Sequence, residues 1–431
     1  MTPQSQFMVV APLAAGCEGG LRALLATMNS APGIADPNNA VLPFGEFDCL
    51  HFARLALLDD PTLGDIEAYG LPRPRAPVYL AFLGDCDGPA REFLAKLAQR
   101  AGAGLRRIFS HCEGFDAATD LLAWMTAHNV PSSASYVNWV GRTVQQVRQE
   151  GALQRALAAK VPRDSVVLTS PQQTRRELIA FVDAEVRAGR LTLTPPAPTP
   201  LGWLLAKLAH LIAVPLAGLV VLPFLVVLSP WLIVALRRRE TSDPEICPRP
   251  DTAALDALQD LEDRDVTNQY TALGSVKPGR FRRGLLIVLL VLVDYVARHL
   301  YTRGHLARVQ SIHFARWAFI DGKSRVVFVS NYDGSHQSYM DDFINKVGWG
   351  LNLVFSNGVG WPRTDWLVCR GARIEQHFKR YQRRHQLPTQ VWYKAYPGLA
   401  LVDLNRNQRI REGLERAQMS DAQALAWLRL L

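Results

Sequence analysis

The chain has 431 residues, which is enough for about two or three domains. Its formal net charge of +9 is spread without a long basic block. No nucleic-acid-binding motif occurs, so we expect an anionic membrane surface rather than a nucleic acid as partner. The six cysteines show no C-x-x-C or zinc-finger spacing, which predicts free thiols in a reducing compartment. The first residues lack the charged and apolar regions of a secretory signal, so we expect none.

The first part of the chain alternates short apolar runs with segments of helical periodicity. Strands are predicted at Phe7–Leu13, Leu50–Leu58, Val78–Leu83 and Tyr136–Val140. Helices are predicted at Glu18–Met28, from Asp87 onwards, at Thr119–His128 and at Val144–Leu157. The resulting order, β-α-β-β-α-β with an added helix, is that of a ferredoxin-like unit.

Residues 161–200 are predicted to connect this unit to the segment that follows. We expect a strand at Val166–Leu168, an amphipathic helix up to Gly189 and a proline-rich turn at Pro195–Pro200.

The segment Leu201–Leu236 is almost wholly apolar, and Lys207 and His210 are its only titratable residues. It exceeds the roughly 20 residues that a helix needs to cross a bilayer, so residues 201–239 are predicted to insert into a membrane. A linker over residues 240–267 is expected to follow.

The prolines of this segment bear on its topology. The residues before and after this segment form two similar half-units, as described below, and half-units that share a core must lie on the same side of a membrane. Pro215, Pro223 and Pro230 are placed to break the run into a re-entrant hairpin, which would satisfy this condition. The basic run Arg237–Arg239 predicts that both halves face the cytoplasm. A single span with the halves kept apart is the alternative.

The last part of the chain repeats the first. Its predicted strands are Tyr270–Val276, Ile312–Ile320, Val326–Ser330 and Val391–Tyr396, and its predicted helices include Arg283–Tyr301, Tyr339–Val347 and Asn405–Leu414. The stretch Asp87–Phe115 aligns without a gap to Asp333–Trp361. Identical pairs include Asp87/Asp333, Gly88/Gly334, Gly102/Gly348, Gly104/Gly350, Leu105/Leu351, Phe109/Phe355, Ser110/Ser356 and Gly114/Gly360. The sequence therefore predicts an α+β pseudo-dimer of two ferredoxin-like repeats, over residues 7–160 and 268–431.

Within the second repeat, Leu285–Val293 is apolar on all sides but too short to span a membrane alone. Asp294 and Arg298 follow it directly. This helix is either the buried first helix of the repeat or is seated against the bilayer beside the hairpin.

A His-Phe-Ala-Arg stretch recurs in both copies and contains His51 and Arg54, and His313 and Arg316. Alternate residues of a strand face opposite ways, so His313 and Arg316 are expected on opposite faces. Both faces are largely apolar and therefore covered, and a buried charge needs a partner. These residues either line a polar pocket between two sheets or are bonded internally, with Asp321 or Asp341 as the carboxylate for the arginine.

An Asp-Gly pair recurs in residues 84–88 (GDCDG) and 330–334 (SNYDG). One interpretation is a turn and N-cap before a helix. A tandem of ferredoxin-like units with G-x-x-D-G in one of them also resembles the dye-decolorising haem peroxidases. Only residues 84–88 match that motif literally, because the second copy has Ser330 in place of the glycine, and that family is normally not built around a membrane segment.

The resemblance implies a haem cofactor and a set of site residues. Asp333 and Asp87 would move a proton of the peroxide, and Arg316 and Arg54 would stabilise the departing oxygen. The candidates for the axial iron ligand are His313, His51 and His299, with His305 beside the last. A histidine and an arginine can share one pocket only if a bulge intervenes, or if His313 faces Arg54 and His51 faces Arg316 across packed sheets.

Further along, the basic segment Arg373–His385 has apolar residues at helical spacing. It is either a solvated helix face or a contact for lipid headgroups. No Cys-His metal spacing, P-loop, G-x-S-x-G elbow or nucleotide fingerprint occurs, so hydrolase and nucleotide-dependent functions have no basis in the sequence.

Two functions follow from this sequence. The first is a membrane-associated oxidoreductase that resembles haem peroxidases and acts on an apolar or membrane-derived substrate. The second is a non-catalytic membrane-bound module that binds lipid or a partner. The sequence sets neither the substrate nor the oligomeric state.

Overall fold

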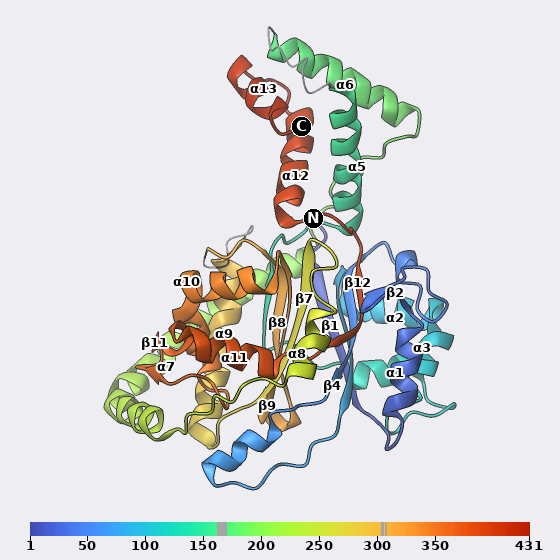
Figure 1. Ribbon diagram of the computed structural model, residues 1–431. Coiled ribbons are helices and arrows are strands. Elements are labelled where there is room, and N and C mark those ends of the chain that lie inside the picture. Colours follow the sequence, from blue (N-terminus) through green and yellow to red (C-terminus); the bar gives the residue numbers. More distant parts are fainter. Residues whose placement is uncertain (162–169, 303–305, 307) are drawn as a thin grey trace.

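The computed structural model describes residues 1–161, 170–302, 306 and 308–431 and is a mixed α+β protein (Figure 1). Two β-sheets stand side by side in the body, helices cover them, and a helical stalk rises from one end. The predicted α+β class is therefore confirmed. The predicted strand Val166–Leu168 and the candidate His305 lie outside the described residues.

The larger sheet has six strands in the order β1-β5-β4-β12-β3-β2, and the smaller has four in the order β6-β8-β9-β7. The strands of the larger sheet are β1 (Gln4–Pro12), β2 (Asn29–Ala31), β3 (Ile34–Ala35), β4 (Leu50–Leu58), β5 (Tyr79–Asp87) and β12 (Thr389–Lys394). Those of the smaller are β6 (Ala134–Val137), β7 (Thr267–Ser275), β8 (Ile312–Ile320) and β9 (Arg325–Asp333). A separate ribbon joins β10 (Thr364–Asp365) and β11 (Cys369–Arg370).

Each half of the chain completes the sheet of the other half. The strand β6 comes from the N-terminal half and pairs with β8, placing Tyr136 opposite Ala315. The strand β12 comes from the C-terminal half and pairs with β4, placing Trp392 opposite Arg54. Neither half could satisfy the backbone hydrogen bonds of its own sheet alone.

A β-bulge occurs at the same place in β4 and β8. In β4, Leu50 and Phe52 face consecutive residues of β5, which leaves His51 as an extra residue. In β8, His313 is left over in the same way. Because an extra residue shifts the alternation by one, His313 and Arg316 both reach toward the larger sheet. The predicted placement of these two residues on opposite faces is therefore wrong.

An apolar core fills the space between the two sheets. Its side chains come from both, among them Met8, Val10, Ala81, Leu83, Ala318, Ile320, Val327 and Val329. The outer face of the larger sheet packs against α1 (Glu18–Ala26), α2 (Ala90–Arg100), α3 (Gly102–Phe109) and α4 (Leu121–Ala127). The outer face of the smaller sheet packs against α9 (Arg280–His299), α10 (His336–Phe355) and α11 (Glu375–His385). The body is thus layered, with the two sheets inside.

The helix α9 has both of the environments that the sequence left open. Leu286 and Leu290 are buried in the core of the smaller sheet, whereas Val288 and Val291 are exposed. The helix therefore has one buried apolar face and one free apolar face.

The stalk is also shared by the two halves of the chain. The helices α5 (Val144–Lys160) and α12 (Leu401–Glu415) run side by side from the body and carry α6 (Pro171–Arg187) and α13 (Asp421–Leu428) at their far end (Figure 1). A separate apolar core holds these helices together and includes Leu153, Leu157, Leu178, Val182, Ile410, Trp427 and Leu428.

The apolar segment between the halves forms one continuous helix, α7 (Leu201–Ser242), with three prolines inside it. The predicted break of this run into the two arms of a hairpin is therefore wrong, because a proline inside a long helix can bend it without ending it. Whether α7 enters and leaves the membrane by one face stays a prediction. By length and composition, α7 is the one described helix that is apolar enough to cross a membrane. The short helix α8 (Thr252–Gln259) then leads to β7.

Several predicted elements lie where the sequence placed them, and the shortest ones were missed. The predicted strands Leu50–Leu58 and Ile312–Ile320 coincide with β4 and β8. The unpredicted elements include β2, β3 and α13. They also include the single-turn helices η1 (Phe44–Glu46), η3 (Asp321–Lys323) and η4 (Gly371–Arg373), and the longer η2 (Leu63–Tyr69).

A glycine pair at one position of the repeated segment provides a test of this packing. A Cβ at Gly104 would overlap the carbonyl oxygen of Val41, whereas a Cβ at Gly350 would have nothing within 4 Å. We expect Gly104→Ala to lower the free energy of unfolding by about 1–3 kcal/mol. Gly350→Ala should be neutral or raise it by up to about 1 kcal/mol. Denaturant unfolding of the parent and both variants in one detergent measures this, and equal losses at both positions would contradict the packing described.

Candidate functional site

Two histidine–aspartate pairs lie at corresponding ends of the two sheets. His51 Nε2 is 3.0 Å from Asp87 Oδ1, and His313 Nε2 is 2.7 Å from Asp333 Oδ1. Each pair joins the bulged residue of one strand to the last residue of the neighbouring strand. The structure therefore brings these four predicted site residues together two by two.

Each aspartate also binds the first residue of a stalk helix. Asp87 Oδ2 accepts a hydrogen bond of 2.9 Å from the amide of Val144 in α5. Asp333 Oδ2 accepts one of 2.7 Å from the amide of Leu401 in α12. A carboxylate at this position satisfies a free amide and complements the helix dipole. The aspartates cap these distant helices and not α2 and α10, which follow them in the sequence, so the predicted local N-cap is wrong.

The surroundings of Asp333 favour its ionised form. Burial alone would raise the pKa of this carboxyl group, but His313, the amide of Leu401 and the hydroxyl of Thr267 together lower it below its usual value. The Thr267 hydroxyl donates to Asp333 Oδ1 at 2.7 Å. Asp333 is therefore held as a carboxylate by three neighbours.

Aromatic rings fill the space between the two pairs. The ring of His51 lies 5.4 Å from that of Phe314, and the ring of His313 lies 5.3 Å from that of Phe52. Each histidine thus contacts a phenylalanine of the opposite sheet. The hydroxyl of Tyr396 is 3.2 Å from His51 Nδ1, so both ring nitrogens of His51 are engaged.

Arg54 and Arg316 cross between the sheets in opposite directions. Arg54 projects from β4 and donates to the carbonyl oxygens of Tyr270 on β7 and Ser330 on β9, each at 2.9 Å. Arg316 projects from β8 and donates to carbonyl oxygens on β1 and β5 at 2.6 and 2.8 Å. Both side chains are almost wholly buried. Their main-chain partners tie each sheet to the backbone of the other.

One carboxylate lies between the two guanidinium groups. Asp85 Oδ1 accepts from Arg316 at 2.6 Å, and Asp85 Oδ2 accepts from the side-chain amide of Asn331 at 3.3 Å. The oxygen of Asn331 in turn accepts from Arg54. Burial lowers the pKa of Arg54 to about 9, although Asp85 acts in the opposite direction. Two buried cations therefore share one buried anion.

The partners predicted for Arg316 are wrong. Asp321 and Asp341 each pair with a different basic residue. Asp85 and Asn331 were not among the predicted site residues. They occupy the same position in the two copies of the repeated motif, two residues before its aspartate. The repeated motif was the signal that could have identified them.

One of the predicted haem-binding residues, His51, does not fit that role in this geometry. An axial ligand needs a free imidazole nitrogen that faces the iron. His51 has none, and His313 Nε2 is bonded to Asp333. One cavity, described below, lies between the smaller sheet and its covering helices, and a second lies beside the turn between β8 and β9. Neither His51 nor His313 lines these two cavities. Within the described ranges, no group of three or more His, Cys, Asp or Glu is placed to hold a metal ion. The haem site remains a prediction.

His299, the third predicted ligand, has a different neighbour. It lies at the end of α9, with its Nε2 2.9 Å from Nδ1 of His210 in α7. The hydroxyl of Tyr295 donates to the carbonyl oxygen of Leu211 at 3.3 Å. His299 therefore takes part in the contact between α9 and α7.

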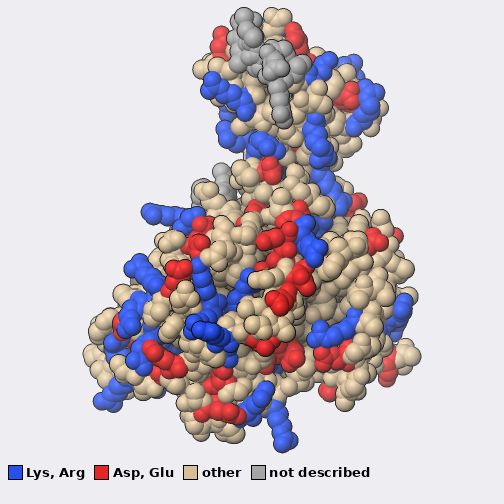
Figure 2. Space-filling view, in the orientation of Figure 1, with Lys and Arg blue, Asp and Glu red and all other residues tan. Residues whose placement is uncertain are grey.

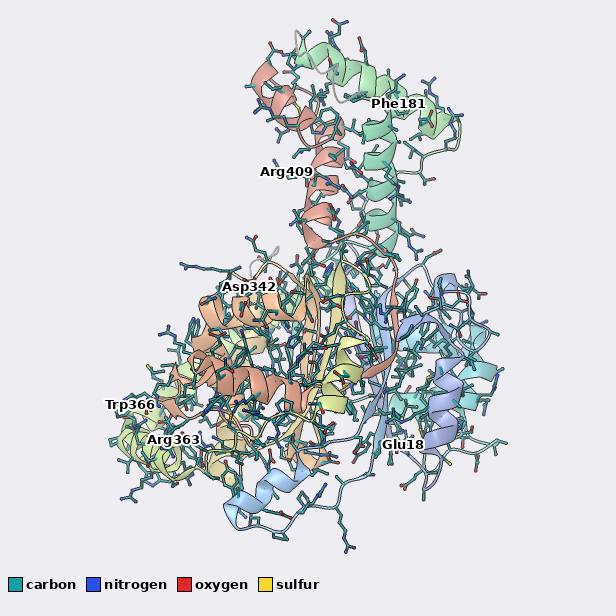
Figure 3. The ribbon with its side chains drawn as sticks, viewed as in Figure 1. Glu18, Phe181, Asp342, Arg363, Trp366 and Arg409 are labelled. Atoms are coloured by element: carbon teal, nitrogen blue, oxygen red, sulfur yellow. The ribbon has the colours of Figure 1, made fainter. Side chains whose placement is uncertain are left out.

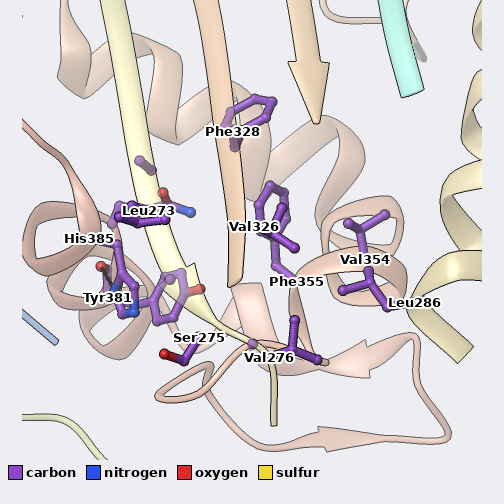
Figure 4. Close-up of a pocket in the computed structure, with 14 residues that line it drawn as sticks. Leu273, Ser275, Val276, Leu286, Val326, Phe328, Val354, Phe355, Tyr381 and His385 are labelled. Atoms are coloured by element: carbon purple, nitrogen blue, oxygen red, sulfur yellow. Dashed lines mark hydrogen bonds between the residues drawn. The ribbon is translucent and has the colours of Figure 1, made fainter. Parts of the chain in front are cut away.

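A small cavity of about 40 Å³ lies between the smaller sheet and α9, α10 and α11 (Figure 4). Leu286, Phe328 and Phe355 contribute to its apolar wall. Tyr381 and His385 also line it, and the buried Nε2 of His385 has no hydrogen-bond partner among the described residues. A space of this size holds only a few water molecules.

The basic helix α11 uses its arginines inside the protein. Arg383 forms a two-point ion pair with Glu262, and Arg384 forms one with Asp65. Phe378 of the same helix is buried. Arg383 and Arg384 therefore bind carboxylates inside the protein. They do not form the solvated helix face that was one of the two predicted roles of this segment.

The chain matches no protein-family model, no curated protein and no solved structure. Its function is therefore inferred from the geometry described above. The buried polar residues between the sheets join strands, sheets and stalk helices to one another.

Asp85 provides the test of this buried network. In Asp85→Asn, two buried guanidinium groups lose the carboxylate between them, so we expect the free energy of unfolding to fall by about 3–5 kcal/mol. The matched control is Asp342→Asn, which breaks the partly exposed pair with Lys346 and should cost about 0–1 kcal/mol. Denaturant unfolding compares the two, and a loss for Asp85→Asn no larger than the control's would refute the shared-anion arrangement.

Proposed function

We propose that the protein is a non-catalytic module that attaches to one face of a membrane and there binds lipid or a partner. The observation that carries this proposal is the surface of α7. In its most apolar stretch of 18 residues none is buried, and the mean hydropathy is 2.8. A hydrocarbon environment is what covers such a surface.

The free face of α9 extends this apolar surface. Val288, Val291 and Leu292 are 56, 46 and 50% exposed, although other residues of the same helix are buried in the core. The contact between α7 and α9 supports one continuous membrane-facing patch, made of the exposed apolar side chains of both helices.

The helix α7 contacts α9 at two places, one in its first half and one in its second half. In the first half of α7, His210 contacts His299 of α9. The ring centre of His210 is also 5.9 Å from that of Tyr295. In the second half of α7, the ring of Trp231 lies 6.3 Å from that of Phe281. The helix is therefore attached to the same body at two places.

These two contacts support attachment from one side. Phe281 and His299 are 18 residues apart in α9, or roughly 27 Å along the helix axis. This span is shorter than the hydrocarbon core of a bilayer, which is about 30 Å thick, and therefore favours both contacts on one face of it. We infer that the middle of α7 bows into the bilayer at its prolines while both ends stay on one side. Arg237–Arg239 supports the cytoplasmic side.

We also propose that the two halves are duplicated ferredoxin-like units. The strand orders β12-β4-β5-β1 and β6-β8-β9-β7 correspond, and the bulged histidines occupy equivalent places in them. The crossed arginines and the aspartate caps of the stalk helices correspond as well. Such a pseudo-dimer with exchanged strands needs both halves on one side of the membrane.

The oxidoreductase function stays a prediction. Its candidate residues are engaged in hydrogen bonds to other parts of the protein, which is why we favour the binding module. An absorbance scan of the purified protein for a Soret band tests the haem prediction directly.

Cysteine labelling tests the one-sided attachment. On a background without the other cysteines, we expect an impermeant maleimide to label the exposed Cys369 near the end of α7 and an engineered Gln172→Cys on the stalk from the same, cytoplasmic, side. Leu225→Cys, in the middle of α7, should react only after detergent is added. Labelling of Cys369 and Gln172→Cys from opposite faces would rule the proposal out.

A further inference from the structure

Positive charge gathers around Asp243, where α7 ends beside the start of α9. Asp243 Oδ2 is 2.9 Å from Lys277 Nζ and 2.6 Å from Arg282 Nη2. The carbonyl oxygen of Asp243 accepts from Arg363 at 3.3 Å. The next acidic residue, Glu245, is half exposed and 3.8 Å from Arg363. Lys277 and Arg282 therefore share one largely buried carboxylate, with Arg363 beside them on the main-chain oxygen. These four residues are called the Asp243 cluster below.

Several polar atoms of the Asp243 cluster lack partners among the described residues. Arg282 is 1% exposed, yet its Nε and Nη1 are buried without an acceptor. The nearby hydroxyl of Tyr69 is also without a hydrogen bond, and the Nε of Arg363 has only the 3.8 Å ion pair with Glu245. Buried polar atoms are nearly always hydrogen-bonded, so unused guanidinium donors indicate an anionic acceptor. Burial also lowers the pKa of Lys277 to about 8, despite the pull of Asp243.

The N-terminus of α9 adds to this positive potential. Its N-cap is Gly279, and no side chain caps the free amides of the first turn. Arg280, Arg282 and Arg283 lie in that turn, where the helix dipole favours acids instead. A Cβ at Gly279 would meet nothing within 4 Å, so there is open space beside the turn. Free amides at a helix N-terminus with cations beside them are suited to a phosphate group.

Further arginines border the Asp243 cluster on the side of the apolar patch. Arg238, Arg239, Arg280 and Arg283 have no carboxylate partner among the described residues. The guanidinium of Arg239 lies 4.5 Å from the ring centre of Phe281, which in turn contacts the exposed Trp231. Lys and Arg are prominent on the flank that carries α7 and α11 (Figure 2), where Arg363 and Trp366 also lie (Figure 3). Cations and aromatic rings at the edge of an apolar surface are typical of the headgroup level of a membrane.

We propose that the Asp243 cluster and the first turn of α9 bind the phosphate group of an anionic phospholipid headgroup. The inference rests on the proposed membrane attachment of α7. A lipid bound here would place its phosphate beside Arg282 and its acyl chains along the apolar patch. The helix α11 is equally basic, but its paired Arg383 and Arg384 are not available for this role.

Vesicle binding of the full chain tests the proposal. We expect the protein to bind vesicles of phosphatidylcholine with added phosphatidylglycerol more tightly than vesicles of phosphatidylcholine alone. The double variant Arg280→Gln/Arg283→Gln should lose most of this preference, about fivefold in affinity for each arginine. Arg282→Gln should lose it too, but this side chain is buried, so the exposed double variant keeps the test valid if Arg282→Gln does not fold.

The matched control removes the same charge from the stalk. Arg409→Gln/Arg429→Gln alters two exposed arginines, one in α12 and one directly after α13, and Arg409 lies far from Arg363 of the Asp243 cluster in Figure 3. This variant should keep the preference for anionic vesicles. An equal loss in both double variants would show that only net charge matters and would overturn the assigned site.

The remaining outcomes separate this inference from the proposed function. Equal binding to both kinds of vesicle, unchanged in the α9 variant, would leave the membrane attachment standing and overturn the phosphate site. No binding to either kind would remove the proposed function itself. The last experiment compares inorganic phosphate with phosphatidylglycerol micelles as additives in detergent. If inorganic phosphate raises the melting temperature of the protein as much as the micelles do, the site takes free phosphate and the lipid assignment is wrong.

Discussion

The crossed arginines impose the main constraint on this molecule. Arg54 and Arg316 each leave one sheet and are satisfied by main-chain carbonyl oxygens of the other. A guanidinium group in an apolar core is very unfavourable without such partners. The two sheets must therefore keep one separation and one register, with Asp85 and Asn331 between the charges. The exchanged strands β6 and β12 strengthen this constraint, because each belongs to the sheet of the opposite half.

The histidine–aspartate pairs connect the sheets to the stalk. Each aspartate connects a bulged histidine in a sheet to the first amide of α5 or α12, so the stalk is fixed to both sheets through buried hydrogen bonds. Histidine, aspartate and arginine are the residue types of a peroxidase site, and here they hold the architecture together. The same side chains would be free for catalysis only if these bonds were broken. The exposed apolar patch of α7 and α9 is consequently the surface that we associate with function.

The sequence was sufficient for β4 and β8, because each is a nearly continuous apolar run, and for α5, because its buried positions recur at helical spacing. Sequence pattern has limits, however. It could not reveal the bulges at His51 and His313, since one extra residue in a ladder depends on the partner strand. It could not assign Asp85 to Arg316, because that contact joins residues 231 positions apart. The continuity of α7 was missed for another reason. A proline removes one hydrogen bond, and whether the helix bends or ends there depends on the rest of the structure.

The shared strands and crossed arginines make the two sheets one cooperative unit, and native-state hydrogen exchange tests this cooperativity most directly. In detergent, at increasing denaturant, the most protected amides of β4 and β8 should converge on one opening free energy. The reason is that opening either sheet strips the other of an exchanged strand and of a buried arginine's partners. If the amides of one sheet instead exchanged at a lower denaturant concentration while those of the other stayed protected, the two halves would be independent domains and the account would be contradicted.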